Sequence, residues 1–121
     1  MNNLNNSSIL SNVVYGVPSG NYDGSSLDWT SDAVPAADYY QGNGSIQTIN
    51  ITVDNFIGNI VLEGSLNSTS TTKVWFNIQD YNCAVATTAT QSYTVIGNYV
   101  WMRAHIINFT QGNISNVTLV Y

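Results

Sequence analysis

The chain contains few side chains that act as acids, bases or nucleophiles. Its 121 residues include one His, one Cys, two basic and seven acidic residues. The only imidazole, His105, lies in the middle of a run that alternates like a strand, and no Gly-x-Ser-x-Gly turn of the kind that presents a nucleophilic serine occurs. We therefore expect a strand histidine with a structural or interface role and predict no catalytic residue and no enzyme activity.

The acidic residues and the cysteine are the other side chains that could act in catalysis or bind a metal. Glycoside hydrolysis needs two carboxyl groups about 5 to 10 Å apart, one with a raised pKa, whereas Asp in turns usually accepts local hydrogen bonds. The Asp-x-Asp-x-Asp-Gly calcium loop is absent, and one His with one Cys cannot complete a zinc site. We expect Cys83 to be a small residue in or beside a strand, and no metal or cofactor to bind. Four of the carboxylates lie in one turn-rich segment: Asp23, Asp28, Asp32 and Asp38.

One run of residues has a more informative pattern. Between positions 99 and 106 the even residues are compact and apolar, whereas the odd residues are large, amphipathic and able to hydrogen bond. With the even set in the core, the opposite face presents an aromatic and cationic stripe. On an earlier strand, Val74, Phe76 and Ile78 are expected to point inward and their neighbours outward. The candidate interface residues are Lys73, Trp75, Tyr99, Trp101, Arg103 and His105.

Three interpretations of this face are open. Trp, Tyr and Arg are enriched at the energetic centres of protein–protein interfaces. Indole and phenol rings on a flat sheet can also stack on sugar rings, as in a carbohydrate-binding module. Alternatively, the rings pack under the loops of residues 19–44, with Arg103 extending over them.

Composition excludes several classes of protein. Charged residues make up 7% of the chain, against about 25% in an ordinary soluble domain, and 17 Asn, 13 Ser and 12 Thr supply the polarity instead. Two cations cannot neutralise a nucleic-acid backbone, so no nucleic-acid partner is expected. No apolar run approaches the roughly 18 residues of a membrane span, and the N-terminus lacks a signal-peptide pattern. We expect synthesis in a cytoplasm and no membrane partner.

Short strand-like runs separated by turn residues follow one another along the chain, with no helical period. This spacing predicts an all-β protein with seven or eight strands, a single antiparallel β-sandwich of jelly-roll or immunoglobulin-like type. Residues 1–8 form a short extended N-terminal arm, residues 9–121 form the domain, and residues 19–44 are a turn-rich but packed excursion within it. The expected turns or connections after residue 45 are 54–58, 67–72, 82–91, 97–98 and 112–113.

Two segments have residue patterns that resemble those of a known group of proteins. The first, in residues 46–76, combines an alternating strand with Asp-Asn-Phe-Ile-Gly-Asn-Ile, Glu-Gly-Ser-Leu and Val-Trp-Phe. The second combines Gly-Asn-Tyr-Val-Trp-Met-Arg-Ala at 97–104 with Asn-Phe-Thr-Gln-Gly-Asn-Ile at 108–114. Residues 45–121 thereby resemble small virion structural proteins of tailed bacteriophages, in particular those of marine cyanophages.

This resemblance implies an all-β domain exposed on a virus particle, with binding as its activity. The leading hypothesis is a capsid decoration (cement) protein that binds the outside of the shell and stabilises it. The alternatives are a tail, neck or fibre component, and a carbohydrate-binding or adhesin module. The expected partners are other virion proteins, either the major capsid protein or tail proteins, together with further copies in a homo-oligomer or symmetric array. A host-surface glycan is the partner in the adhesin alternative. The expected location is the virion, after synthesis in the host cytoplasm.

Overall fold

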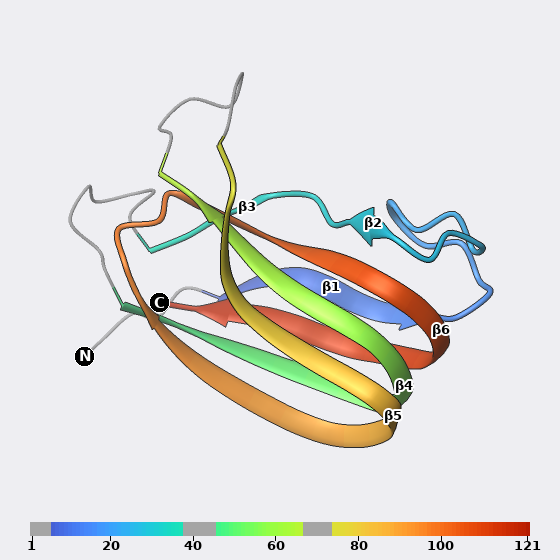
Figure 1. Cartoon of the computed structure of the whole chain (residues 1–121). Helices are drawn as coiled ribbons and strands as arrows, with labels where there is room; N and C mark the ends of the chain where they lie inside the picture. Colours follow the sequence, from blue (N-terminus) through green and yellow to red (C-terminus); the bar gives the residue numbers. More distant parts are fainter. Residues whose placement is uncertain (1–5, 38–45, 67–73) are drawn as a thin grey trace.

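The computed structural model describes residues 6–37, 46–66 and 74–121, and all regular structure in these ranges is β-strand (Figure 1). The all-β class is therefore confirmed. No helix in these ranges is long and apolar enough to cross a membrane. The strands are β1 (Asn6–Val14), β2 (Trp29–Thr30), β3 (Val34–Pro35), β4 (Ile46–Ser65), β5 (Phe76–Ile96) and β6 (Trp101–Val120).

All six strands belong to one antiparallel sheet. The strand order is β1-β6-β4-β5, and the two short strands β2 and β3 pair with β6 beyond the end of β1. β4 is the central strand, because β5 pairs with one of its edges and β6 with the other along most of its length (Figure 1). The hydrogen bonds thus form a single open sheet, and a sandwich of two separate sheets is not confirmed.

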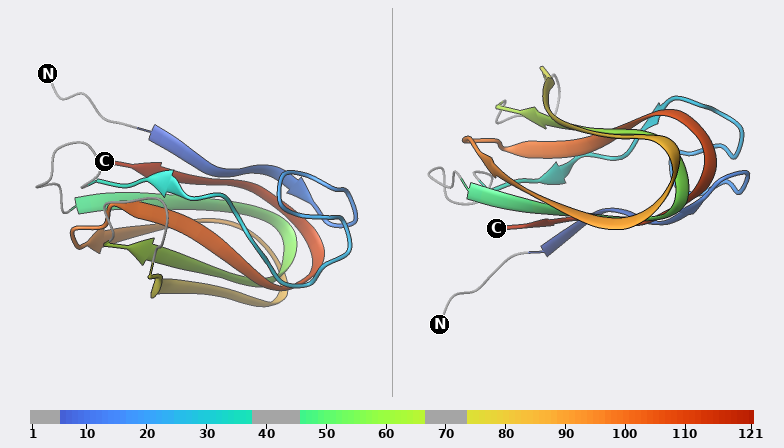
Figure 2. Two further views of the ribbon diagram at one scale, coloured as in Figure 1. Left: turned by 90° about the horizontal axis from the view of Figure 1, so that it is seen from above. Right: turned by 60° about the horizontal axis from the view of Figure 1, so that its bottom comes forward.

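The three longest strands are bent back on themselves. β4, β5 and β6 have 20, 21 and 20 residues, about twice the usual upper length of a strand, and Figure 2 shows all three curving through the same end of the molecule. At the bend the β4–β5 and β4–β6 registers shift repeatedly between Val53 and Asn59, and such bulges bend a strand. Asn55 and Gly112 adopt left-handed backbone conformations there, with φ of 56° and 83°.

Three of the expected boundaries between strands are wrong because of this bend. Residues 54–58, 82–91 and 112–113 were expected to connect separate strands, but they lie inside β4, β5 and β6. Asn and Gly favour positive φ in hairpin turns and in bulges alike. The same residues therefore produce a bend inside a continuous strand here. The described ranges contain six strands, where seven or eight were expected.

Bending brings the apolar face of the sheet around a single core. The first arm of β4 contributes Ile49, Ile51 and Val53, and its second arm contributes Ile60 and Leu62, all of them buried. On β6 the expected core face is also confirmed, since Met102, Ala104 and Ile106 are buried.

Residues 15–37 close one side of this core. The rings of Tyr22 and Trp29 lie 5.3 Å apart, and Tyr22 lies 5.1 Å from Phe109 of β6. The expected packed excursion is therefore ordered over residues 19–37, whereas residues 38–44 lie outside the described ranges. β1 begins at Asn6, so the end of the expected arm 1–8 is strand, and residues 1–5 are not described.

Replacing Gly112 by Ala should show how tightly the bend is built. Gly112 has φ of 83°, and a Cβ atom there would overlap the backbone carbonyl of Asn55 on β4. Gly16 has nearly the same φ, 85°, but open space around it. We expect Gly16→Ala to cost about 1 kcal/mol of unfolding free energy and Gly112→Ala about 2 to 4 kcal/mol. Denaturant unfolding of both variants measures the difference, and equal losses would show that the overlap is relieved without cost.

Asp23 should titrate at an unusually low pH. Its Oδ1 accepts hydrogen bonds from the backbone N–H groups of Ser25 and Ser26 at 2.9 and 2.7 Å, and its Oδ2 accepts one from the Ser26 hydroxyl at 2.7 Å. These bonds, the Ser25 amide first, lower the pKa of Asp23 from 3.8 to about 2. Because the pKa is lower in the folded state, the stabilisation is complete above pH 4 and is lost as the pH falls through about 2. Carboxyl ¹³C NMR measures the midpoint, and Asp23→Asn should remove that part of the pH dependence of stability.

Candidate functional site

The stripe expected on β6 is present. Trp101, Arg103 and His105 are half-buried on one face of the strand, and the residues between them face the core. Five of the six candidate interface residues are described, and Lys73 lies outside the described ranges.

Tyr99 does not belong to this stripe. β6 begins at Trp101, so the strand alternation does not extend back to Tyr99. The Tyr99 ring packs against the core and lies close to Gly64 and Gly97, where an added Cβ would come within 2.6 and 2.5 Å of it. Tyr99 lines a shallow hollow of about 470 Å³ together with Leu66, Phe76, Gly97 and Asn98.

The inward face expected at the start of β5 is only partly correct. Ile78 packs against the core, but Val74 and Phe76 are 55% and 47% exposed. The register skips Ile78 between the pairs Leu62–Gln79 and Glu63–Asn77. This bulge changes the alternation of side chains on the preceding residues.

Glu63 joins the candidate residues into one group. It pairs with Arg103 on β6 and with Asn77 on β5, so it lies in the middle of the three strands. Arg103 Nε donates a hydrogen bond of 2.6 Å to Glu63 Oε1, and His105 Nδ1 lies 3.4 Å from Glu63 Oε2. The Arg103 guanidinium carbon lies 4.2 Å from the centre of the Trp75 ring. We call Glu63, Trp75, Arg103 and His105 the Glu63 cluster.

Arg103 is held in place from two directions. One edge of its guanidinium faces the Glu63 carboxylate, and one face of the group lies over the Trp75 indole. Glu63 is only 7% exposed, and a charge-assisted hydrogen bond to a desolvated carboxylate is stronger than one in water. The cation–π contact adds to this restraint. Arg103 is therefore positioned before any partner arrives.

Trp75, Arg103 and His105 border one face of the sheet, as expected, whereas Glu63 was not among the expected site residues. Glu63 is the only glutamate in the chain and occupies an alternating strand position between two apolar residues. A lone carboxylate in such a strand needs a cation on a neighbouring strand. This need for a neighbouring cation is the feature of the sequence that points to Glu63 as a site residue.

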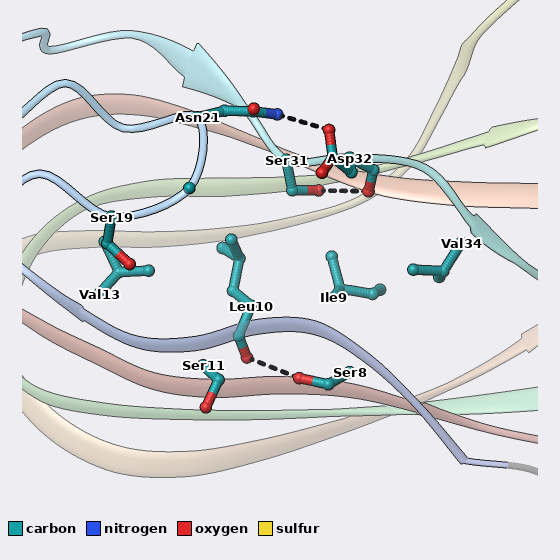
Figure 3. A pocket seen from close by; sticks show the side chains of 11 residues that line it. Ser8, Ile9, Leu10, Ser11, Val13, Ser19, Asn21, Ser31, Asp32 and Val34 are labelled. Carbon is teal, nitrogen blue, oxygen red and sulfur yellow. Dashed lines mark hydrogen bonds between the residues drawn. The ribbon is translucent and has the colours of Figure 1, made fainter.

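A second hollow lies on the open side of the sheet. It has a volume of about 410 Å³ between β1 and residues 19–34, and Figure 3 shows Ile9, Leu10 and Val13 reaching into it from β1. Asn21 Nδ2, on its rim, donates hydrogen bonds of 3.0 Å to Asp32 Oδ1 and to the Thr30 carbonyl. The rim amide is thus engaged by its own segment rather than presented to a ligand.

The described ranges contain no group of three His, Cys, Asp or Glu residues that could hold a metal ion. Cys83 is a buried residue inside β5, as expected for a small strand residue.

Comparison of the chain with protein-family models, curated proteins and solved structures gives no match. A functional proposal therefore depends on the residues of this chain and on their geometry.

A double-mutant cycle tests whether the Glu63–Arg103 pair is one unit. Glu63→Gln keeps the shape of the side chain but leaves the guanidinium without its anion, which should cost about 1 to 3 kcal/mol of unfolding free energy. Arg103→Met removes the cation and keeps much of the packing. We expect the double variant to lose less than the sum of the single losses, by about 1 to 2 kcal/mol. Additive losses in urea unfolding would show that the two side chains do not stabilise each other.

Proposed function

We propose that the protein is a non-enzymatic virion structural protein, most specifically a capsid decoration (cement) protein that binds the outer surface of a phage shell. The observation that supports this most is the position of Arg103, restrained by Glu63 and Trp75 on a half-exposed sheet face. Restrained Arg and Trp side chains are typical anchors of protein interfaces.

The Glu63 cluster suits a polar acceptor on a partner protein. Arg103 is the only arginine in the chain, and its planar group suits backbone carbonyls or a carboxylate. Because Arg103 is already ordered, binding loses less side-chain entropy than it would with a free arginine. Many copies on a symmetric shell would add their separate contacts, so a small contact area suffices for tight attachment.

The resemblance of residues 45–121 to small phage virion proteins supports a particle as the site of action. A tail, neck or fibre position is the nearest alternative to the capsid. We further propose that the two arms of the bent sheet form the two layers of a sandwich, since their apolar faces share one core.

A carbohydrate-binding or adhesin function is a second candidate, because Trp101 and Trp75 both border the same sheet face. The contact between Arg103 and Trp75 counts against it. Sugar stacking needs an open ring face, and the guanidinium already covers one face of the Trp75 ring.

Purified particles test the proposed location. We expect mass spectrometry and cryo-electron microscopy of intact virions to show this chain on the outside of the head, at the high copy number of a capsid lattice. Added to shells that lack it, the wild-type protein should bind, and Arg103→Ala should bind about tenfold more weakly or worse. Ser11→Lys on β1 is a matched surface control and should bind normally. Absence of the chain from particles would overturn the virion assignment, whereas low copy number in the tail would move it away from the capsid.

A glycan array separates the second candidate from the first. The decoration hypothesis predicts no glycan binding. Binding that Trp101→Ala abolishes would instead establish the carbohydrate-binding function. Binding that survives this substitution would place any sugar site away from the β6 stripe.

A further inference from the structure

β5 is a long unpaired edge of the sheet. It has 21 residues, and within the described ranges it pairs with β4 alone. Figure 1 shows it curving along the outside of the sheet from end to end. Its second backbone edge therefore presents a row of N–H and C=O groups that form no hydrogen bonds with a described strand.

Natural proteins usually protect such an edge, and β5 has little protection. Lys, Pro, charged side chains and bulges are the common means of blocking strand addition. Residues 76–96 contain no Lys, Arg, Pro or Gly, and Asp80 is their only charge. On the opposite edge, β1 is interrupted by a register shift between Ser8 and Leu10 and by a left-handed residue, Asn12, with φ of 52°, whereas the register shifts of β5 all lie before Ala89.

The regular part of the β5 edge is its second arm. Residues 89–96 run in unbroken register with residues 53–46 of β4, from the pair Val53–Ala89 to the pair Ile46–Ile96. The bulges of β5 all lie before this arm. At the end of the arm, Ile96 and Ile46 are 76% and 61% exposed, side by side on neighbouring strands. A regular uncharged edge thus ends in an exposed apolar pair.

We propose that residues 89–96 of β5 pair antiparallel with the same segment of a second copy of this chain. In such a pair the two-fold axis is perpendicular to the sheet and passes midway between the two copies of one residue near the centre of the arm, Ser92 or Tyr93. Either axis joins the two sheets into one and brings uncharged residues opposite each other. The pairing also places Thr88 or Thr90 of the second copy opposite the exposed Ile96.

The charge distribution favours a second copy as the occupant. The whole chain has a net charge of −5, so two copies repel each other over most approaches. None of residues 89–96 is charged, and this edge lets two copies meet without direct like-charge contact. Self-pairing through β5 does not depend on the proposed virion function. It also leaves the Glu63 cluster available for another partner, because residues 89–96 pair with residues 53–46 of β4 and not with the part that holds Glu63.

Sedimentation or light scattering over a range of protein concentrations tests this pairing. We expect the wild-type chain to form a dimer as concentration rises. Ser92 is exposed at the centre of the arm, and its hydroxyl donates a hydrogen bond to Asn50 Oδ1 of the same molecule. Ser92→Lys and Ser92→Glu should each weaken dimerisation about tenfold or more, because like charges then meet across the axis. An equimolar mixture of the two variants should restore it.

The control variant is Ser11→Lys, an exposed lysine on the opposite edge strand, which should dimerise like the wild type. Matching melting temperatures of the monomeric variants would show that they remain folded. A wild-type chain that stays monomeric at high concentration would overturn the proposal. So would a dimer that the Ser92 substitutions leave intact, because copies would then meet through another surface.

Discussion

The fold depends on three long strands bending at the same level. A sheet with one apolar face needs a second layer to cover it, and no helix in residues 6–37, 46–66 and 74–121 provides one. β4, β5 and β6 instead fold over so that the sheet covers its own face. Bulges and left-handed residues make this possible without ending any strand, and β4 keeps both of its partners through the bend.

The bend also explains why the Glu63 cluster exists. Once the even-numbered side of the second arm of β4 faces the core, Val61, Glu63 and Ser65 face away from it, yet all three are buried. The β6 residues opposite them all have long side chains: His105, Arg103 and Trp101. A carboxylate in that position needs a cation and a hydrogen-bond donor, and Arg103 meets both needs. The arrangement that stabilises the sheet therefore also fixes the most chemically distinctive surface of the molecule.

The sequence predicts the faces of strands better than their ends. Alternation correctly assigns Ile49, Ile51 and Met102 to the core, because burial on one face imposes a period of two. It does not distinguish a hairpin turn from a bulge, since Asn55 and Gly112 satisfy the backbone of either. It also misses contacts between distant strands, because the pairing of Glu63 with Arg103 follows from a register that only the folded sheet sets.

The ladder between β1 and β6 affects how the protein is made. Residues 6–14 pair with residues 113–120, so the paired residues are separated by 99 to 114 positions in the sequence. During synthesis β1 therefore leaves the ribosome long before its partner strand exists. Pairings this distant in sequence form slowly, because the chain between them must first be ordered. A nascent chain stalled before residue 113 retains β1, with its core residues Ile9 and Val13, without its neighbour, so the final stage of folding follows translation of this segment.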